Sequence, residues 1–162
     1  MSQKDWQSDR PLVVDTNTVL SGLIGGVTRR LLFQLDRDLR YPEPSLDEIH
    51  RNQGVIQERA GLSATAIDEL LNRLFNQLTA VPEAAVIREY ETAAEATSPH
   101  PDADSTRQFR DRDEVDVVFL ATALAVDGDV WSDDSVFRHQ NLVAWYRTEA
   151  VIQYSSLELS DE

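Results

Sequence analysis

The chain has 162 residues, 41% of them hydrophobic, and no cysteine, which excludes disulfides, thiolate metal sites and cysteine nucleophiles. Its formal net charge is −14, and of its 15 basic residues only Lys4 is a lysine. We favour a protein adapted to a high-salt cytoplasm over one that is merely acidic, and the charge argues against nucleic acid as a partner unless salt screens the repulsion.

We expect one domain over residues 12–154, between a polar N-terminal tail at 1–11 and a frayed C-terminal tail at 155–162. No apolar run approaches the roughly 20 residues of a transmembrane helix. The polar start of the chain lacks the apolar core of a signal peptide. The sequence therefore predicts a soluble cytoplasmic protein without membrane contact.

Short apolar runs alternate with segments of helical spacing along this domain. In chain order they predict a strand at 12–14, helices at 19–24 and 27–35, a strand at 39–41, helices that begin at 45 and 63, a strand at 78–81, a helix at 84–96, an exposed loop at 98–112, a helix at 113–126, strands at 130–132 and 142–146, and a helix at 148–154. Gly25 and Gly26 interrupt the first two helices, and Thr28 is the expected cap of the second. The alternation predicts an α/β fold, a three-layer sandwich with a central, mostly parallel sheet.

Four carboxylates lie at the edges of segments that we expect to be buried: Asp15, Glu48, Asp116 and Asp134. Buried charges are costly unless they are paired, and four of one sign cannot pair with each other. If the fold gathers them, a divalent cation is the natural neutraliser. Ligand sites of such sheets lie beyond the carboxyl ends of the strands, where Asp15 and Asp134 fall.

Each acid also has a possible structural role. Asp15 could cap the helix after its strand, and Glu48 could complete a capping box that starts at Ser45. Acids at the start of a helix complement its dipole, but Asp116 shares the apolar stripe of its helix. Asp133 and Asp134 both follow a strand, and alternation does not decide which one faces the site, because the chain turns there.

Basic residues give a weaker indication of a ligand. Two arginine pairs could contact a backbone phosphate, namely Arg29 with Arg30 and Arg37 with Arg40. Such arginines more often form surface ion pairs with nearby acids. The sequence has no basic stripe and no aromatic stacking platform.

Four segments, in order, resemble the motifs of the PIN domain family, the metal-dependent ribonuclease fold of many toxin–antitoxin toxins and RNA-processing nucleases. These segments are 13–22 with Asp15, 45–49 with Glu48, 116–124 with Asp116, and 130–137, where Ser132 precedes Asp134 by two positions. The resemblance covers residues 12–154. Two positions depart from the family pattern: Asp133 stands where an uncharged residue is usual, and Val136 stands where many members have a second acid.

The resemblance implies an endoribonuclease that uses Mg²⁺ or Mn²⁺ to hydrolyse RNA phosphodiester bonds, in the manner of a toxin or of an RNA-processing enzyme. It implies catalytic roles for Asp15, Glu48, Asp116 and Asp134, metal ligation by Asp15, Asp116 and Asp134, and support from Asn17 and Ser132. PIN-like toxins usually dimerise and bind an antitoxin. The implied partners are therefore an RNA substrate, an antitoxin protein and a second copy of the chain.

Two other functions remain open from the sequence. A phosphatase with an aspartyl nucleophile would have a second Asp two residues after the first, and Asn17 stands there instead. A non-catalytic PIN-like domain could serve as an RNA-binding or protein-interaction module, although the complete set of acids argues against it.

Overall fold

The computed structural model describes residues 6–97 and 111–155, and for residues 111–116 and 139 it describes only the backbone. Within these ranges the chain forms a five-stranded parallel sheet with the order β3-β2-β1-β4-β5. The strands are β1 (Leu12–Val14), β2 (Leu39–Pro42), β3 (Leu78–Val81), β4 (Asp129–Trp131) and β5 (Trp145–Tyr146). The central strand β1 is an apolar run that is buried throughout, as expected for a strand covered on both faces.

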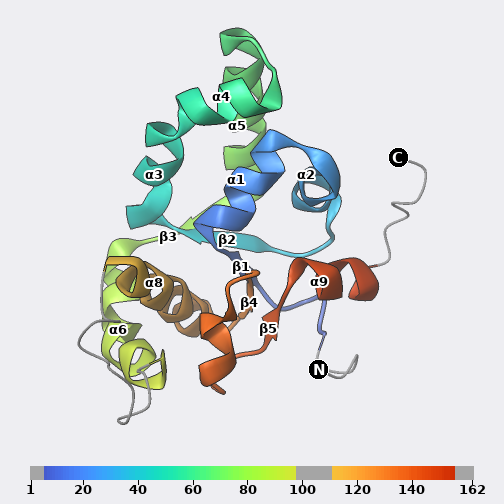
Figure 1. The fold of residues 1–162 in the computed structure, drawn as a ribbon. Helices are drawn as coiled ribbons and strands as arrows, with labels where there is room; N and C mark the ends of the chain where they lie inside the picture. Colours follow the sequence, from blue (N-terminus) through green and yellow to red (C-terminus); the bar gives the residue numbers. More distant parts are fainter. Residues whose placement is uncertain (1–5, 98–110, 156–162) are drawn as a thin grey trace.

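Helices cover both faces of this sheet. They are α1 (Thr16–Ile24), α2 (Gly26–Gln34), α3 (Leu46–Arg51), α4 (Gln53–Ala60), α5 (Ala64–Gln77), α6 (Glu83–Thr97), α8 (Asp111–Val126) and α9 (Thr148–Tyr154), with short 3₁₀ helices η2 (Glu43–Ser45) and η3 (Ser135–His139). Figure 1 shows α1 to α5 on one side of the sheet and α6 with α8 on the other. The predicted three-layer α/β sandwich with a parallel sheet is therefore confirmed. In the described part of the chain, no helix has both the length and the hydrophobicity that a membrane span requires.

The expected break between the first two helices occurs at the glycine pair. Helix α1 ends at Ile24, and Gly25 and Gly26 have φ angles of 142° and 80°, a region that residues with a side chain rarely adopt. The expected cap at Thr28 is wrong. Helix α2 already begins at Gly26, and its N-cap residue Gly25 has no side chain to donate or accept a capping bond.

The predicted capping box at Ser45 is also wrong. Ser45 ends the 3₁₀ helix η2 with φ and ψ of −95° and 0°, and its side chain makes no capping hydrogen bond with α3. A residue in that conformation cannot present its hydroxyl to the N–H groups of the next turn as an extended N-cap residue does. The cap at Ser63, by contrast, forms as expected, because its hydroxyl accepts a hydrogen bond of 3.1 Å from the Ala66 N–H.

Several boundaries differ from the prediction. The strand expected at 142–146 pairs only over Trp145–Tyr146, and the helix expected from 113 begins at Asp111. The loop expected at 98–112 lies outside the described residues up to position 110, and so does the tail from 156. At the other terminus, Trp6 packs its ring edge-on against Tyr146, with 4.9 Å between the ring centroids. The segment that starts at Trp6 is therefore attached to the domain.

A buried ion pair closes the amino-terminal edge of the sheet. The guanidinium of Arg37 donates to Asp129 Oδ2 at 3.0 Å and to the carbonyl oxygens of Arg10 and Pro11 at 2.9 and 3.2 Å. The side chains of Arg37 and Asp129 are only 1% and 2% exposed. Arg10 adds a further contact of 3.3 Å to the same carboxylate. This network joins the starts of β1, β2 and β4, at the edge opposite the carboxyl ends of the strands.

Candidate functional site

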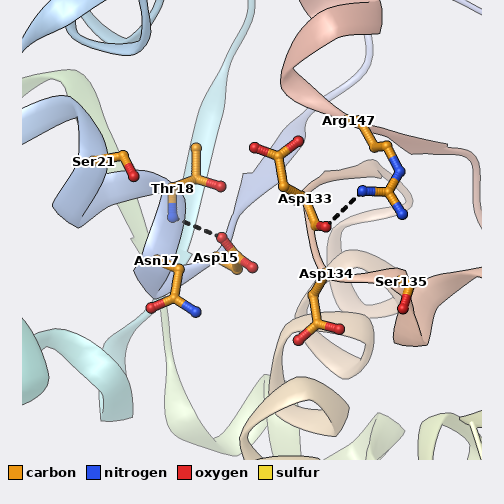
Figure 2. A pocket seen from close by; sticks show the side chains of 8 residues that line it. All are labelled: Asp15, Asn17, Thr18, Ser21, Asp133, Asp134, Ser135 and Arg147. Atoms are coloured by element: carbon orange, nitrogen blue, oxygen red, sulfur yellow. Dashed lines mark hydrogen bonds between the residues drawn. The ribbon is translucent and has the colours of Figure 1, made fainter.

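The carboxyl ends of the neighbouring strands β1 and β4 open onto a pocket. Its volume is about 450 Å³, and it is lined by Asp15, Asn17, Thr18, Ser21, Asp133, Asp134, Ser135 and Arg147. Figure 2 shows two walls, one formed by Asp15 and the start of α1, the other by the segment that follows β4 together with Arg147. The parallel pairing of Val14 with Trp131 brings the two strand ends together. This is the edge at which the sequence places a ligand site.

Asp15 is the buried centre of the pocket, with 4% of its surface exposed. It is the N-cap of α1, since its Oδ1 accepts a hydrogen bond of 2.9 Å from the Thr18 N–H. Its Oδ2 accepts a hydrogen bond of 2.5 Å from the Ser132 hydroxyl. Among the described residues, no basic side chain forms an ion pair with this carboxylate. The structural role of Asp15 as a cap therefore leaves its charge uncompensated.

The protonation equilibrium of Asp15 reflects this environment. Burial raises the pKa of its carboxyl group above the ordinary value, because the charged form loses solvation. The hydrogen bonds from Ser132 and Thr18 act in the opposite direction, and the charge of Asp134 adds to the increase. An anion that the fold destabilises in this way is a favourable partner for a cation.

Ser132 links the two acids of the pocket. Its hydroxyl donates to Asp15 and accepts a hydrogen bond of 3.0 Å from the Asp134 N–H. The Asp134 side chain is half-buried, and its Oδ1 accepts a hydrogen bond of 3.0 Å from the Val136 N–H at the start of η3. The structure thus brings together three of the predicted site residues, two carboxylates and the serine between them.

Asp133 has a different set of contacts. Its Oδ1 accepts from the Thr148 N–H and its Oδ2 from the Thr148 hydroxyl, both at 2.8 Å. These bonds fasten the exposed Asp133 side chain to the first residue of α9. Both acids lie along the pocket, but only Asp134 is linked through Ser132 to Asp15, whereas Asp133 holds a helix terminus.

Glu48 lies beside the pocket rather than in its lining. Its Oε1 accepts a hydrogen bond of 3.4 Å from the Thr16 hydroxyl, the residue directly after Asp15. Thr16 is in turn 2.6 Å from the Tyr41 hydroxyl, which also reaches the Ser45 carbonyl oxygen at 3.2 Å. The capping box does not form, so Glu48 has no role in it, but Glu48 still lies in the first turn of α3, where an acid complements the helix dipole. The Thr16 contact orients its half-buried carboxylate.

Tyr41 is a site neighbour that the sequence analysis did not identify. Burial raises the pKa of its hydroxyl group, the hydrogen bond with Thr16 opposes this, and the charges of Glu48 and Asp15 reinforce it. The sequence contained one signal for this role, a tyrosine in a short strand next to β1, because a buried tyrosine hydroxyl usually has a polar partner. Its partner Thr16 is 25 residues away in sequence and could not be read from local pattern.

The remaining predicted site residues have different outcomes. Asn17 is exposed and lines the pocket next to Asp15. Asp116 belongs to α8, which packs against β1 and β2, but its side chain lies outside the described residues. The expected apolar stripe of that helix is buried at Leu120 and Ala123. Among the described side chains, which do not include Asp116, no three acidic or histidine residues are grouped closely enough to hold a metal ion.

The arginines expected near a phosphate have other partners. Arg29 donates to the carbonyl oxygens of Gly22 and Leu23, at 3.1 and 2.6 Å, near the end of α1. Arg37 is buried against Asp129, and Arg40 pairs with Asp38 at 2.7 Å. The basic side chain that lines the pocket is Arg147, which the sequence analysis did not single out. It follows a strand of two residues, too short to be placed by pattern.

Comparisons with known proteins agree with this architecture. The family model described as PIN domain matches residues 13–155. One solved structure that resembles the chain is VapBC2 from Rickettsia felis bound to a DNA fragment from their promoter, with a TM-score of 0.56 and 10% identity over 85% of this chain and 98% of that one. Another is FitAB bound to an IR36 DNA fragment, with a TM-score of 0.50 and 17% identity over 84% of this chain and 94% of that one.

At these identities the two structures demonstrate a shared fold. The comparison with curated proteins gives no significant match. The family model spans the chain from the middle of β1 to the residue after α9, and so includes the sheet and both walls of the pocket. This chain belongs to the PIN domain family.

Proposed function

We propose that this protein is a metal-dependent endoribonuclease that acts as the toxin of a toxin–antitoxin pair. The observation that carries the proposal is the Asp15 carboxylate, which is buried at the carboxyl edge of the sheet without a basic partner among the described residues and is joined through Ser132 to Asp134. Membership of a family that generally consists of nucleases supports the reaction class.

The pocket offers oxygen ligands of the type that a divalent cation takes, although its described side chains do not by themselves form a group of three acids close enough to hold one. Carboxylate and amide oxygens are the ligands that Mg²⁺ and Mn²⁺ prefer, and the pocket offers them on Asp15, Asp134 and Asn17. In the proposal, Asp15, Asp134 and Asp116 would hold the metal, with Glu48 as a further ligand or as the group that orients water. When bound, Mg²⁺ or Mn²⁺ supplies a water of lowered pKa and neutralises charge on the phosphoryl oxygens.

The chain's own residues position these groups. The Thr18 N–H and the Ser132 hydroxyl each hold one oxygen of Asp15, which fixes the plane of its carboxylate. The Val136 N–H holds Asp134 in the same manner, and Thr16 holds Glu48. Such supporting contacts commonly decide the affinity and activity of a metal site. In the proposal, the open pocket between the two walls receives a phosphodiester of single-stranded RNA.

The proposed partner is an antitoxin protein. The two solved structures of similar fold, VapBC2 and FitAB, were each determined with bound DNA, VapBC2 with a fragment from the promoter. A PIN domain of this kind would bind DNA through its partner, which agrees with a net charge of −14 on this chain. A homodimer is part of the same proposal.

The test measures cleavage and metal binding on the same protein. Wild type should cleave a mixed-sequence single-stranded RNA in molar salt with Mg²⁺ or Mn²⁺, and EDTA should abolish the cleavage. In Asp15→Asn, cleavage should fall by about 100-fold or more, because one ligand charge is lost while the amide oxygen can still accept the Thr18 N–H. Mn²⁺ should raise the melting temperature of wild type and not that of the variant, since only a state that binds the ion is stabilised by it.

Two results would contradict the proposal. If wild type binds Mn²⁺ but cleaves no RNA with or without a co-expressed partner, the domain is an RNA-binding or protein-interaction module. If Asp15→Asn fails to fold, Asp15 is needed for the structure through more than the cap of α1, which the amide oxygen can keep, and its bond with Ser132 is the contact that is changed. Circular dichroism of both proteins without metal separates this case from a loss of chemistry.

A further inference from the structure

Arg147 introduces a positive charge into an acidic pocket. It is the basic side chain in a lining that otherwise consists of three aspartates and uncharged polar residues. Figure 2 shows it on the wall that carries Asp133, Asp134 and Ser135, across the pocket from Asp15 and the start of α1. A cation beside carboxylates can compensate their charge or bind an anionic ligand, and the contacts of Arg147 distinguish these roles.

The contacts of Arg147 orient its guanidinium without neutralising it. Its Nη1 donates a hydrogen bond of 2.8 Å to the carbonyl oxygen of Asp133. Its guanidinium carbon lies 5.0 Å from the centroid of the Trp145 ring, a cation–π distance. Trp145 is itself held by a hydrogen bond of 2.8 Å from its Nε1 to the Ser132 carbonyl oxygen. The residues that carry the acidic site therefore also fix the direction of Arg147.

The charge of Arg147 is unpaired within the part of the chain that the structure describes. None of the ion pairs there involves Arg147, although two carboxylates line the same wall. The side chain is exposed, and its hydrogen bond to Asp133, the only one it makes to residues that the structure describes, leaves further N–H donors of the guanidinium available. Arg29, Arg37 and Arg40, in contrast, are occupied by carbonyl or carboxylate oxygens.

We infer that Arg147 binds a non-bridging phosphate oxygen of the RNA strand as that strand enters the pocket. The inference rests on the proposed nuclease function and adds to it the residue that holds the substrate. A chain with a net charge of −14 repels a polyanion, so an oriented guanidinium at the site compensates where the strand must approach the carboxylates. Guanidinium groups bind phosphate through paired N–H donors, which orients the strand without reading its sequence.

The experiment compares wild type with Arg147→Ala, Arg147→Lys and Arg138→Ala. Arg138 is a matched control, because it is an exposed arginine on η3 that does not line the pocket. Single-turnover cleavage of a labelled single-stranded RNA gives the maximal rate and the half-saturating protein concentration. Fluorescence anisotropy in the Asp15→Asn background gives the dissociation constant at a series of salt concentrations.

For Arg147→Ala we expect the half-saturating concentration and the dissociation constant to rise by roughly tenfold or more, because a charge-assisted hydrogen bond is lost. The slope of the logarithm of affinity against the logarithm of salt should become shallower by about 0.7, the value for one phosphate contact on a single strand. Arg147→Lys should keep that slope and lose part of the affinity, because it keeps the charge but not the planar donors. Arg138→Ala should change neither quantity by more than about twofold, as expected for an exposed charge that does not line the pocket.

The outcomes separate this inference from the proposed function. If wild type cleaves and Arg147→Ala keeps the wild-type salt slope, Arg147 binds no phosphate and the nuclease function stands. A merely structural role would lower the melting temperature and the maximal rate without changing the slope. An equal loss in Arg138→Ala would mean that net charge, not position, sets the affinity. Wild type that neither cleaves nor binds RNA would overturn both the inference and the proposed function.

Discussion

Asp134→Asn should lower RNA cleavage by about 100-fold or more, whereas Asp133→Asn should leave it within about threefold of wild type. The two acids are adjacent in sequence, but only Asp134 is linked through Ser132 to Asp15, while both oxygens of Asp133 accept hydrogen bonds from Thr148. In each variant the asparagine oxygen can still accept the main-chain N–H, from Val136 or from Thr148. Each substitution therefore removes one carboxylate charge and leaves the hydrogen bond from the main-chain N–H available. The two variants differ in the position at which the charge is lost.

This prediction is measured as initial rates with saturating Mn²⁺, together with a melting curve for each variant. The expected melting temperatures are similar, since each exchange keeps one main-chain hydrogen bond. Equal loss of activity in both variants would place Asp133 in the chemistry as well, and loss in Asp133→Asn alone would reverse the assignment. A fall in melting temperature that parallels the loss of activity would indicate damage to η3 or α9 instead of a missing ligand.

The sequence was sufficient for the part of the site that local pattern controls. The run Leu12–Val14 is apolar and short, and Asp15 follows it directly, a pattern typical of a strand that is buried on both faces and ends at a ligand site. The same pattern recurs at β4 and Ser132. Because parallel strands end at one edge, recognising two such strands was enough to predict that their terminal residues meet.

The rest of the site depends on contacts between distant residues. The capping box at Ser45 was wrong because η2 intervenes, and the actual contact of Glu48 is Thr16, 32 residues earlier. Tyr41 joins the same group across two strands. These side chains lie next to each other only after the sheet has formed, so local sequence carries no signal for them.

The assignment of Asp133 and Asp134 and the location of Arg147 depend on the exact position of each residue in the fold. Alternation along β4 could not choose between Asp133 and Asp134 at the turn, but their hydrogen bonds differ clearly. Arg147 follows a strand of two residues, and its place in the pocket depends on the register of β5 against β4. The role of Asp116 stays a prediction, because its side chain lies outside the described residues.

The partners of the arginines were also hard to predict from the sequence. The sequence offered Arg37 and Arg40 as contacts for a backbone phosphate, with surface ion pairs to nearby acids as the alternative. The structure supports that alternative for Arg40 with Asp38, whereas Arg37 forms a buried pair with the distant Asp129. The two pairs differ in burial, however. The side chains of Arg37 and Asp129 are 1% and 2% exposed, whereas those of Arg40 and Asp38 are 27% and 44% exposed. The chain thus contains a matched comparison between a buried and an exposed pair.

Asp129→Ala should lower the free energy of unfolding by about 3 to 5 kcal/mol, because it leaves the Arg37 charge buried without a counterion. The cost is expected to be high here, since burial already lowers the pKa of the Arg37 guanidinium and Asp129 opposes that shift. Among the described residues, one Arg37 nitrogen, Nη1, already has no hydrogen-bond partner, so the remaining bonds to Arg10 and Pro11 are poor compensation.

The control is Asp38→Ala, which breaks the exposed pair with Arg40 and should cost no more than about 1 kcal/mol. Urea denaturation followed by circular dichroism at constant high salt measures both variants. A double variant, Arg37→Met with Asp129→Ala, should recover much of the loss, because it removes the unpaired charge as well as its partner. Equal small losses for Asp129→Ala and Asp38→Ala would mean that water reaches Arg37, and that the amino-terminal edge of the sheet does not depend on this ion pair.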